Sequence, residues 1–175
     1  MIDILKSMMF NTDDEASFTN YEKCKGCFKR NGFTCCSEFP CEINASDLLE
    51  ITEENIRKLL DSKLVIMDKW EDNIGIGVGP FELPETYYLR MRGVKDSEYF
   101  DFGFNFYENK CFCLDDTDGC KLPFCHRPYY GRQFDCESFP REELHSGKFD
   151  ACKSWLPYQD LLLKVLYDIL DEIIE

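Results

Sequence analysis

Histidine is scarce in this sequence, which contains only His126 and His145. A catalytic zinc site held by three histidines is therefore excluded. No apolar run approaches the ~20 residues that a membrane-spanning helix needs. The first ten residues also lack a basic segment, a long apolar stretch and a small-residue cleavage site. We therefore expect a cytoplasmic protein with no membrane partner.

Positively charged residues are also few compared with negatively charged ones. The chain has 20 Lys and Arg residues against 34 Asp and Glu residues, which gives a formal net charge of −14 at pH 7. A charge of this sign repels the phosphate backbone of nucleic acids, so we expect no nucleic-acid partner. The sequence also lacks a phosphate-binding loop and an H-E-x-x-H motif. Whether the protein is an enzyme therefore stays open.

Cysteine, in contrast, is abundant, and the eleven cysteines fall into two groups, within residues 24–41 and 111–152. The odd count and the adjacent Cys35 and Cys36 argue against a disulfide framework, which a reducing cytosol also disfavours. Cys24 and Cys27 are two residues apart, a spacing that lets two thiols bind one metal ion. We therefore predict metal ligation by thiolates. A redox dithiol is the weaker alternative, because no apolar strand precedes this pair and no helix follows it.

The remainder of the chain predicts a single α+β domain over residues 1–175. A helix is expected over about 46–62, with a break near Thr52, and a last helix over about 157–175. Strands are expected at 64–69, 86–92 and 99–107, the last with phenylalanine at every second position. The loop-rich region 111–152 lacks apolar periodicity. The predicted fold is a small antiparallel sheet with flanking helices and cysteine-rich metal-binding loops.

The last helix carries more apolar surface than one buried stripe requires. Leu161, Leu163 and Tyr167 widen the apolar face beyond the positions that recur at helical spacing. Deep burial is the default explanation for such width. A homodimer or another protein partner that binds this helix is the alternative.

Four cysteine-bearing segments together resemble a known family. They are Cys24-x-x-Cys27 followed by Cys35-Cys36, then Cys113-x-Asp115-x-x-x-Gly119-Cys120 with Arg127-Pro128, then Cys136-x-x-Phe139-Pro140, and finally Cys152. This set is similar to the YkgJ-type CxxCxxxCC proteins, which are described as zinc- or iron-chelating domains. The resemblance spans about residues 24–152. The gap before Cys35 is longer than the family name states, and Cys41, Cys111 and Cys125 are additional.

The resemblance implies a metal bound by thiolates from both ends of the chain, and the additional cysteines should then matter less. The implied ligands are Cys24, Cys27, Cys35, Cys36, Cys113, Cys120, Cys136 and Cys152. Within the broader group, flagellin lysine N-methylases carry a related cysteine motif. An enzyme or accessory factor that modifies proteins or carries out redox chemistry with a cluster is therefore the alternative function, although no methyl-donor-binding glycine loop is present.

The type of ligand atom restricts which metals the protein could bind. Thiolates suit zinc and iron–sulfur clusters, whereas calcium and magnesium require oxygen ligands. Adjacent Cys35 and Cys36 are awkward ligands for one tetrahedral zinc ion, because successive side chains of an extended backbone point apart. Irregularly spaced cysteines from distant loops are compatible with a [4Fe–4S] cluster. An iron–sulfur cluster is therefore favoured over zinc.

Overall fold

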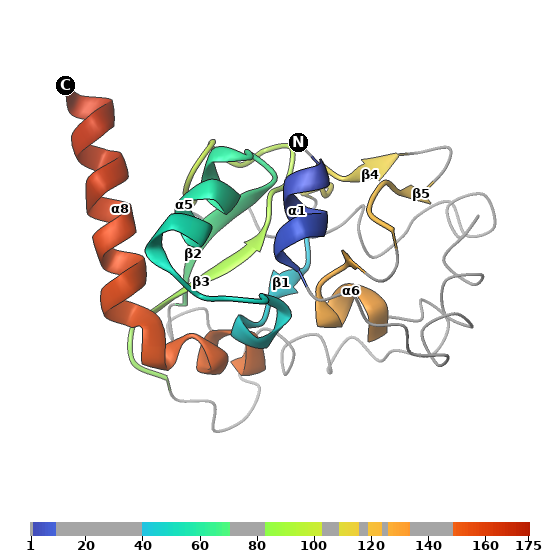
Figure 1. The fold of residues 1–175 in the computed structure, drawn as a ribbon, viewed down its shortest axis with the longest axis horizontal. Coiled ribbons are helices and arrows are strands. Elements are labelled where there is room, and N and C mark those ends of the chain that lie inside the picture. The colour runs from blue at the N-terminus through green and yellow to red at the C-terminus, as the bar shows by residue number, and fades with distance from the viewer. Residues whose placement is uncertain are drawn as a thin grey trace.

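A three-stranded antiparallel sheet forms the centre of the molecule (Figure 1). The computed structural model describes residues 2–9, 40–70, 83–102, 109–115, 119–123, 126–133 and 149–175. Strand β3 (Thr86–Met91) lies between β1 (Glu42–Ile43) and β2 (Val65–Trp70). The register pairs Arg90 of β3 with Glu42 on one side and with Ile66 on the other. Residues from Tyr88 to Met91 are all buried, so both faces of β3 are covered.

Two helices cover the sheet on one side. Helix α5 (Glu53–Asp61) begins after Thr52, whose hydroxyl accepts a hydrogen bond from the backbone N–H of Asn55 at 3.2 Å. The long helix α8 (Gln159–Ile174) follows the 3-10 turn η3 (Leu156–Tyr158) and packs against α5 and β3. Its core face consists of Leu162, Val165, Leu166 and Ile169.

Side chains fix α8 at both of its ends. The Gln159 amide accepts a hydrogen bond from Tyr87 N–H at 2.8 Å and donates one to the Tyr87 carbonyl at 2.9 Å, as a neighbouring strand would. Near the other end, the Arg57 guanidinium of α5 donates to both carboxylate oxygens of Glu172 at 2.9 and 2.6 Å. The helix is therefore held to the sheet and to α5.

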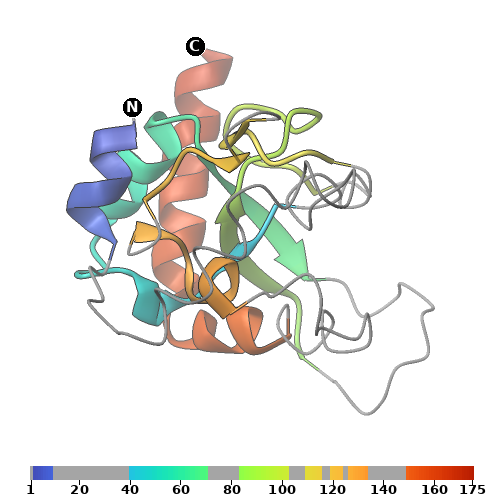
Figure 2. The ribbon, with the colours of Figure 1, turned by 90° about the vertical axis from the view of Figure 1, so that its right-hand side faces the viewer.

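Smaller elements lie around this core. Helix α1 (Ile2–Met8) packs on α5 through buried Leu5, and the 3-10 turn η1 (Ala45–Asp47) follows β1. The hairpin of β4 (Leu114–Asp115) and β5 (Gly119–Cys120) and the short helix α6 (Tyr129–Gln133) lie on the side of the sheet away from α8 (Figures 1 and 2). In the described part of the chain, no helix is long and apolar enough to span a membrane.

The α+β class, the small antiparallel sheet and the flanking helices confirm the sequence prediction. The predicted helix at 46–62 is divided near Thr52 as expected, into the turn η1 and helix α5. The strands predicted at 64–69 and 86–92 correspond to β2 and β3. The helix predicted over about 157–175 corresponds to the turn η3 and helix α8.

The prediction of a third strand at 99–107 is wrong for its described part, residues 99–102. Phe100 makes only an isolated parallel bridge to Met67 of β2, and Phe102 is exposed. The reason is that β1 already occupies the edge of β3 at which a following antiparallel strand would pair. The chain instead reaches the open edge of β2, where it runs in the parallel direction. Residues 103–107 lie outside the described residues.

Replacing Trp155 by Phe should test how strongly the C-terminal region holds β1. The buried indole N–H donates to the Ile43 carbonyl at 2.7 Å, so the variant leaves a buried acceptor without this donor. We expect a loss of about 1–3 kcal/mol in the free energy of unfolding, measured by urea titration. Tyr167→Phe, at an exposed position, should change stability by less than about 0.5 kcal/mol. Equal stability of the two variants would contradict this role.

Candidate metal centre

Three of the eight predicted ligands lie in the described part of the chain. Cys113 and Cys152 are buried, and Cys120 is partly buried. The other five lie outside the described residues: Cys24, Cys27, Cys35, Cys36 and Cys136. Cys152 lies in the core, where its charge would act on the Tyr88 hydroxyl.

Backbone hydrogen bonds bring cysteines from distant parts of the chain to one end of β3. The Cys41 carbonyl accepts a bond from Met91 N–H at 2.9 Å. Two residues after Met91, Gly93 forms a bridge with Cys111. Cys41 and Cys111, which are seventy residues apart in sequence, therefore lie on neighbouring segments that flank the end of this strand.

The β4–β5 hairpin adds two more cysteines to this end of the sheet. Cys113 directly precedes β4, and its carbonyl accepts a bond from Lys121 N–H at 2.8 Å. Cys120 ends β5 and pairs in register with Leu114. We call Cys41, Cys111, Cys113 and Cys120 the thiol group. Its members come from three segments of the chain.

The thiols of this group influence one another. Burial is the main cause that raises the pKa of Cys41, and the charges of Cys111, Glu42, Cys120 and Asp47 raise it further. A hydrogen bond with the Cys113 thiol, followed by burial and the charge of Cys113, raises the pKa of Cys111. A thiolate at Cys41 or at Cys111 is therefore unfavourable beside the other thiols of the group. A bound cation removes such a cost, because metal ligation stabilises the deprotonated thiol.

The chemistry of this donor set fits a thiophilic metal, but the described residues do not complete a site. Among the ranges that the structure describes, no three His, Cys, Asp or Glu side chains are arranged so that they could hold a metal ion. His126 has a buried Nδ1 without a hydrogen-bond partner, so a nitrogen donor is available in the loop after Cys120. Helix α6 lies against one member of the group: a Cβ at Gly131 would lie 3.3 Å from the Cys41 sulfur.

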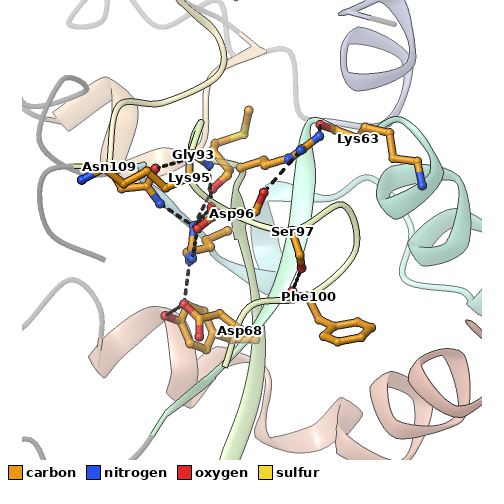
Figure 3. A network of polar contacts seen from close by, with 12 residues as sticks. Lys63, Asp68, Gly93, Lys95, Asp96, Ser97, Phe100 and Asn109 are labelled. Carbon is orange, nitrogen blue, oxygen red and sulfur yellow. Dashed lines mark hydrogen bonds and ion pairs between the residues drawn. The ribbon is translucent and has the colours of Figure 1, made fainter. Parts of the chain in front are cut away.

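A buried ionic network centred on Arg90 lies close enough to the thiol group for the Arg90 charge to act on Cys111. Figure 3 shows Asp68, Asp96 and Asn109 of this network. The Arg90 side chain is 0% exposed and donates to Asp68 at 2.6 Å and to the two carboxylate oxygens of Asp96 at 2.5 and 3.0 Å. The Tyr88 hydroxyl donates to the same oxygen of Asp68 at 3.1 Å. A buried guanidinium requires such partners, because its desolvation is otherwise unfavourable.

Asp96 connects this network to the segment that carries Cys111. It accepts hydrogen bonds from Gly93 N–H and from the Asn109 amide, both at 2.6 Å. Asn109 in turn accepts one from Lys95 N–H at 3.0 Å. The positive charge of Arg90 also lowers the pKa of Cys111, against the larger causes that raise it. The network therefore fixes the position of the cysteine segment. Of its charged groups, Arg90 favours the Cys111 thiolate, while Asp68 and Asp96 balance the charge of Arg90.

Gly93 has no room for a side chain at this junction. A Cβ built on it would lie 2.2 Å from the Asn109 amide oxygen, the group that holds the turn at Lys95. Any other residue would have to displace Asn109 from its bonds.

Sequence reasoning set Cys41 and Cys111 aside because they fall outside the family pattern. The structure places both in the thiol group. One sequence signal was available for Cys111, which stands in a Cys-x-Cys arrangement with Cys113. No such signal was available for Cys41, because the pairing of the strands, and not a nearby sequence motif, brings it close to the other thiols.

The sequence matches no family model and no curated protein, and the fold matches no solved structure. The resemblance to the CxxCxxxCC proteins therefore stays a prediction.

The Arg90 network should make stability depend on pH. Burial alone would raise the pKa of Asp96, but the bonds from Arg90, Gly93 and Asn109 outweigh it and hold this pKa below its ordinary value. The ionised carboxylate thus stabilises the fold above the unfolded Asp pKa of ~3.9, and this contribution is lost as pH falls through the lower folded value. Asp96→Asn should cost about 1–3 kcal/mol at pH 7.

The difference in the free energy of unfolding between wild type and Asp96→Asn should become smaller toward pH 3, as measured by urea unfolding across the pH range. Asp168→Asn on α8 serves as the matched control and should show no such convergence. A difference that stays constant with pH would contradict the proposed role of the Asp96 charge.

Proposed function

We propose that this protein binds a metal through cysteine thiolates, with an iron–sulfur cluster favoured over zinc. The observation that supports it best is the thiol group itself. Cys41 belongs to the first cysteine region and lies with Cys111, Cys113 and Cys120 of the second, across a long interval without cysteine. A site that draws ligands from both ends of the chain requires this convergence.

The proposed ligand set keeps the eight cysteines of the family pattern and adds Cys41 and Cys111. A single cluster or zinc ion takes four thiolates, so ten candidates exceed one site. The cysteines outside the described residues would complete the coordination that the thiol group begins. The position of the thiol group beside the Arg90 network supports the inclusion of Cys111.

The Arg90 network supports the thiol group by positioning Cys111. Arg90 and Asn109 both donate hydrogen bonds to Asp96, and these bonds hold the Cys111 segment in place. Partners behind the ligands commonly orient them and adjust the metal in this way. When bound, the metal would supply either structural order or electron transfer. The residues of the chain itself hold the cysteine segments together.

Fewer observations support the alternative functions. A cluster-dependent protein-modifying or redox enzyme, or an accessory factor related to flagellin lysine N-methylases, is supported by the resemblance alone. A redox dithiol without metal would use the same thiols, and metal analysis separates it from the main proposal. A cytoplasmic location and the absence of nucleic-acid partners also stay proposals that rest on composition and charge.

Anaerobic purification followed by metal analysis and absorption spectroscopy tests the metal. We expect stoichiometric iron with sulfide and a visible absorption band, or stoichiometric zinc without one. Protein that is folded yet contains neither metal, and that takes up neither on reconstitution, would overturn the proposal.

Serine substitution tests the ligands. Cys120→Ser and Cys41→Ser should each lose most of the metal, because each removes a thiolate from the group. Phe112→Ser is the matched control, since it lies between Cys111 and Cys113, is exposed and removes no thiol. Full metal retention in Cys41→Ser together with loss in Cys120→Ser would restrict the site to the family pattern. Equal retention in all three variants would reject the assignment.

A further inference from the structure

Helix α8 has a second apolar face besides the one that packs in the core. Leu163, Tyr167, Leu170 and Ile174 follow one another at spacings of four, three and four residues. Tyr167 is 60% exposed and Ile174 is 81% exposed, while the two leucines are partly buried. We call these four residues the outer stripe. It adjoins the core face of the helix, and Leu170 also packs against the core.

The position and spacing of the outer stripe are those of a helix–helix contact. In Figure 1, α8 lies at the margin of the molecule, with α5 and the sheet on its inner side. The alternation of four and three residues is the heptad pattern of a coiled-coil seam, with Tyr167 and Ile174 at position a and the two leucines at position d. Contiguous exposed apolar side chains of this kind mark an interaction surface.

The charges beside the outer stripe indicate which partner fits. In this heptad, position e is occupied by Lys164 and Asp171, residues of opposite sign. The opposite flank, position g, carries apolar Leu166 and Ile173. Residues at e face residues at e when two such helices run antiparallel. A second copy in that orientation would therefore place Lys164 against Asp171 twice, once in each direction, whereas a parallel arrangement would place both charges against the apolar flank.

We propose that a second copy of this chain docks antiparallel along the outer stripe of α8, so that Lys164 of each copy pairs with Asp171 of the other. Such a contact is two-fold symmetric, and each copy contributes the same surface. Lys164 already donates to Glu53 of α5 at 2.5 Å, but its side chain stays 59% exposed and an ammonium group has three donors. Because one short helix pair is smaller than a standard interface, the dimer should be reversible and depend on protein concentration.

Sedimentation equilibrium of the purified full chain, at about 0.15 M salt to screen the net negative charge, tests the dimer. The wild type should associate reversibly into dimers. Lys164→Asp and Asp171→Lys should each weaken self-association by about tenfold, because each replaces two attractive contacts with two repulsive ones. An equimolar mixture of the two variants should recover association, because the heterodimer restores opposite charges at both contacts. Tyr167→Glu should abolish association.

Lys58→Asp is the matched control, since it reverses an exposed lysine on α5 whose ion pair in the described part of the chain is with Glu54 of the same helix. It should leave dimerisation unchanged, and circular dichroism should show the same helix content in every variant. A wild type that stays monomeric at the highest concentration would overturn the proposal, and so would a mixture of the two charge variants that fails to associate. The experiment does not require bound metal, so it can fail while the metal proposal stands.

Discussion

A fully buried guanidinium is the constraint on which this structure depends. Arg90 lies at the centre of the sheet with no access to water, and it is acceptable there only because Asp68 and Asp96 are held within hydrogen-bond distance. Asp68 ties β3 to β2, while Asp96 ties β3 to the turn that follows it. The sheet and the cysteine-bearing segment beyond Asn109 are thereby joined through this network as well as through the backbone bridge between Gly93 and Cys111. Packing contributes as well, since Cys111, Cys113 and Leu114 of that segment are buried in the core.

Local patterns predicted the elements whose signals are local. Thr52 followed by acidic residues identified the start of α5, and the apolar and branched residues after Leu64 identified β2. Residues 99–102, the described start of the strand expected from the alternating phenylalanines, do not form a strand, because pairing is decided by which edge of the sheet is open. The two-residue strand β1 occupies that edge, and its sequence, Glu42–Ile43, is too short to carry a strand pattern.

The candidate site was predictable only in part, for a similar reason. Motif spacing identified Cys113 and Cys120, because both belong to one hairpin. Cys41 joins them through a backbone hydrogen bond to Met91, and Cys111 through a bridge to Gly93. Both contacts follow from how β3 is placed in the sheet, and no pattern of residues near Cys41 encodes them. Asp96 and Asn109 were missed as well, since an acid and an amide thirteen residues apart give no signal until a buried arginine requires them.

The hydrogen bond from Trp155 to the Ile43 carbonyl provides the protein with an optical probe of its own. Of the two tryptophans, Trp155 is fully buried and Trp70 is partly exposed, so their emission should differ in wavelength and in accessibility to quenchers. Ile43 lies two residues from Cys41. A chromophore bound near that cysteine would accept excitation energy from Trp155 without emission of light and would shorten the excited-state lifetime of this tryptophan. Fluorescence lifetime would then report on the occupancy of the centre without any added label.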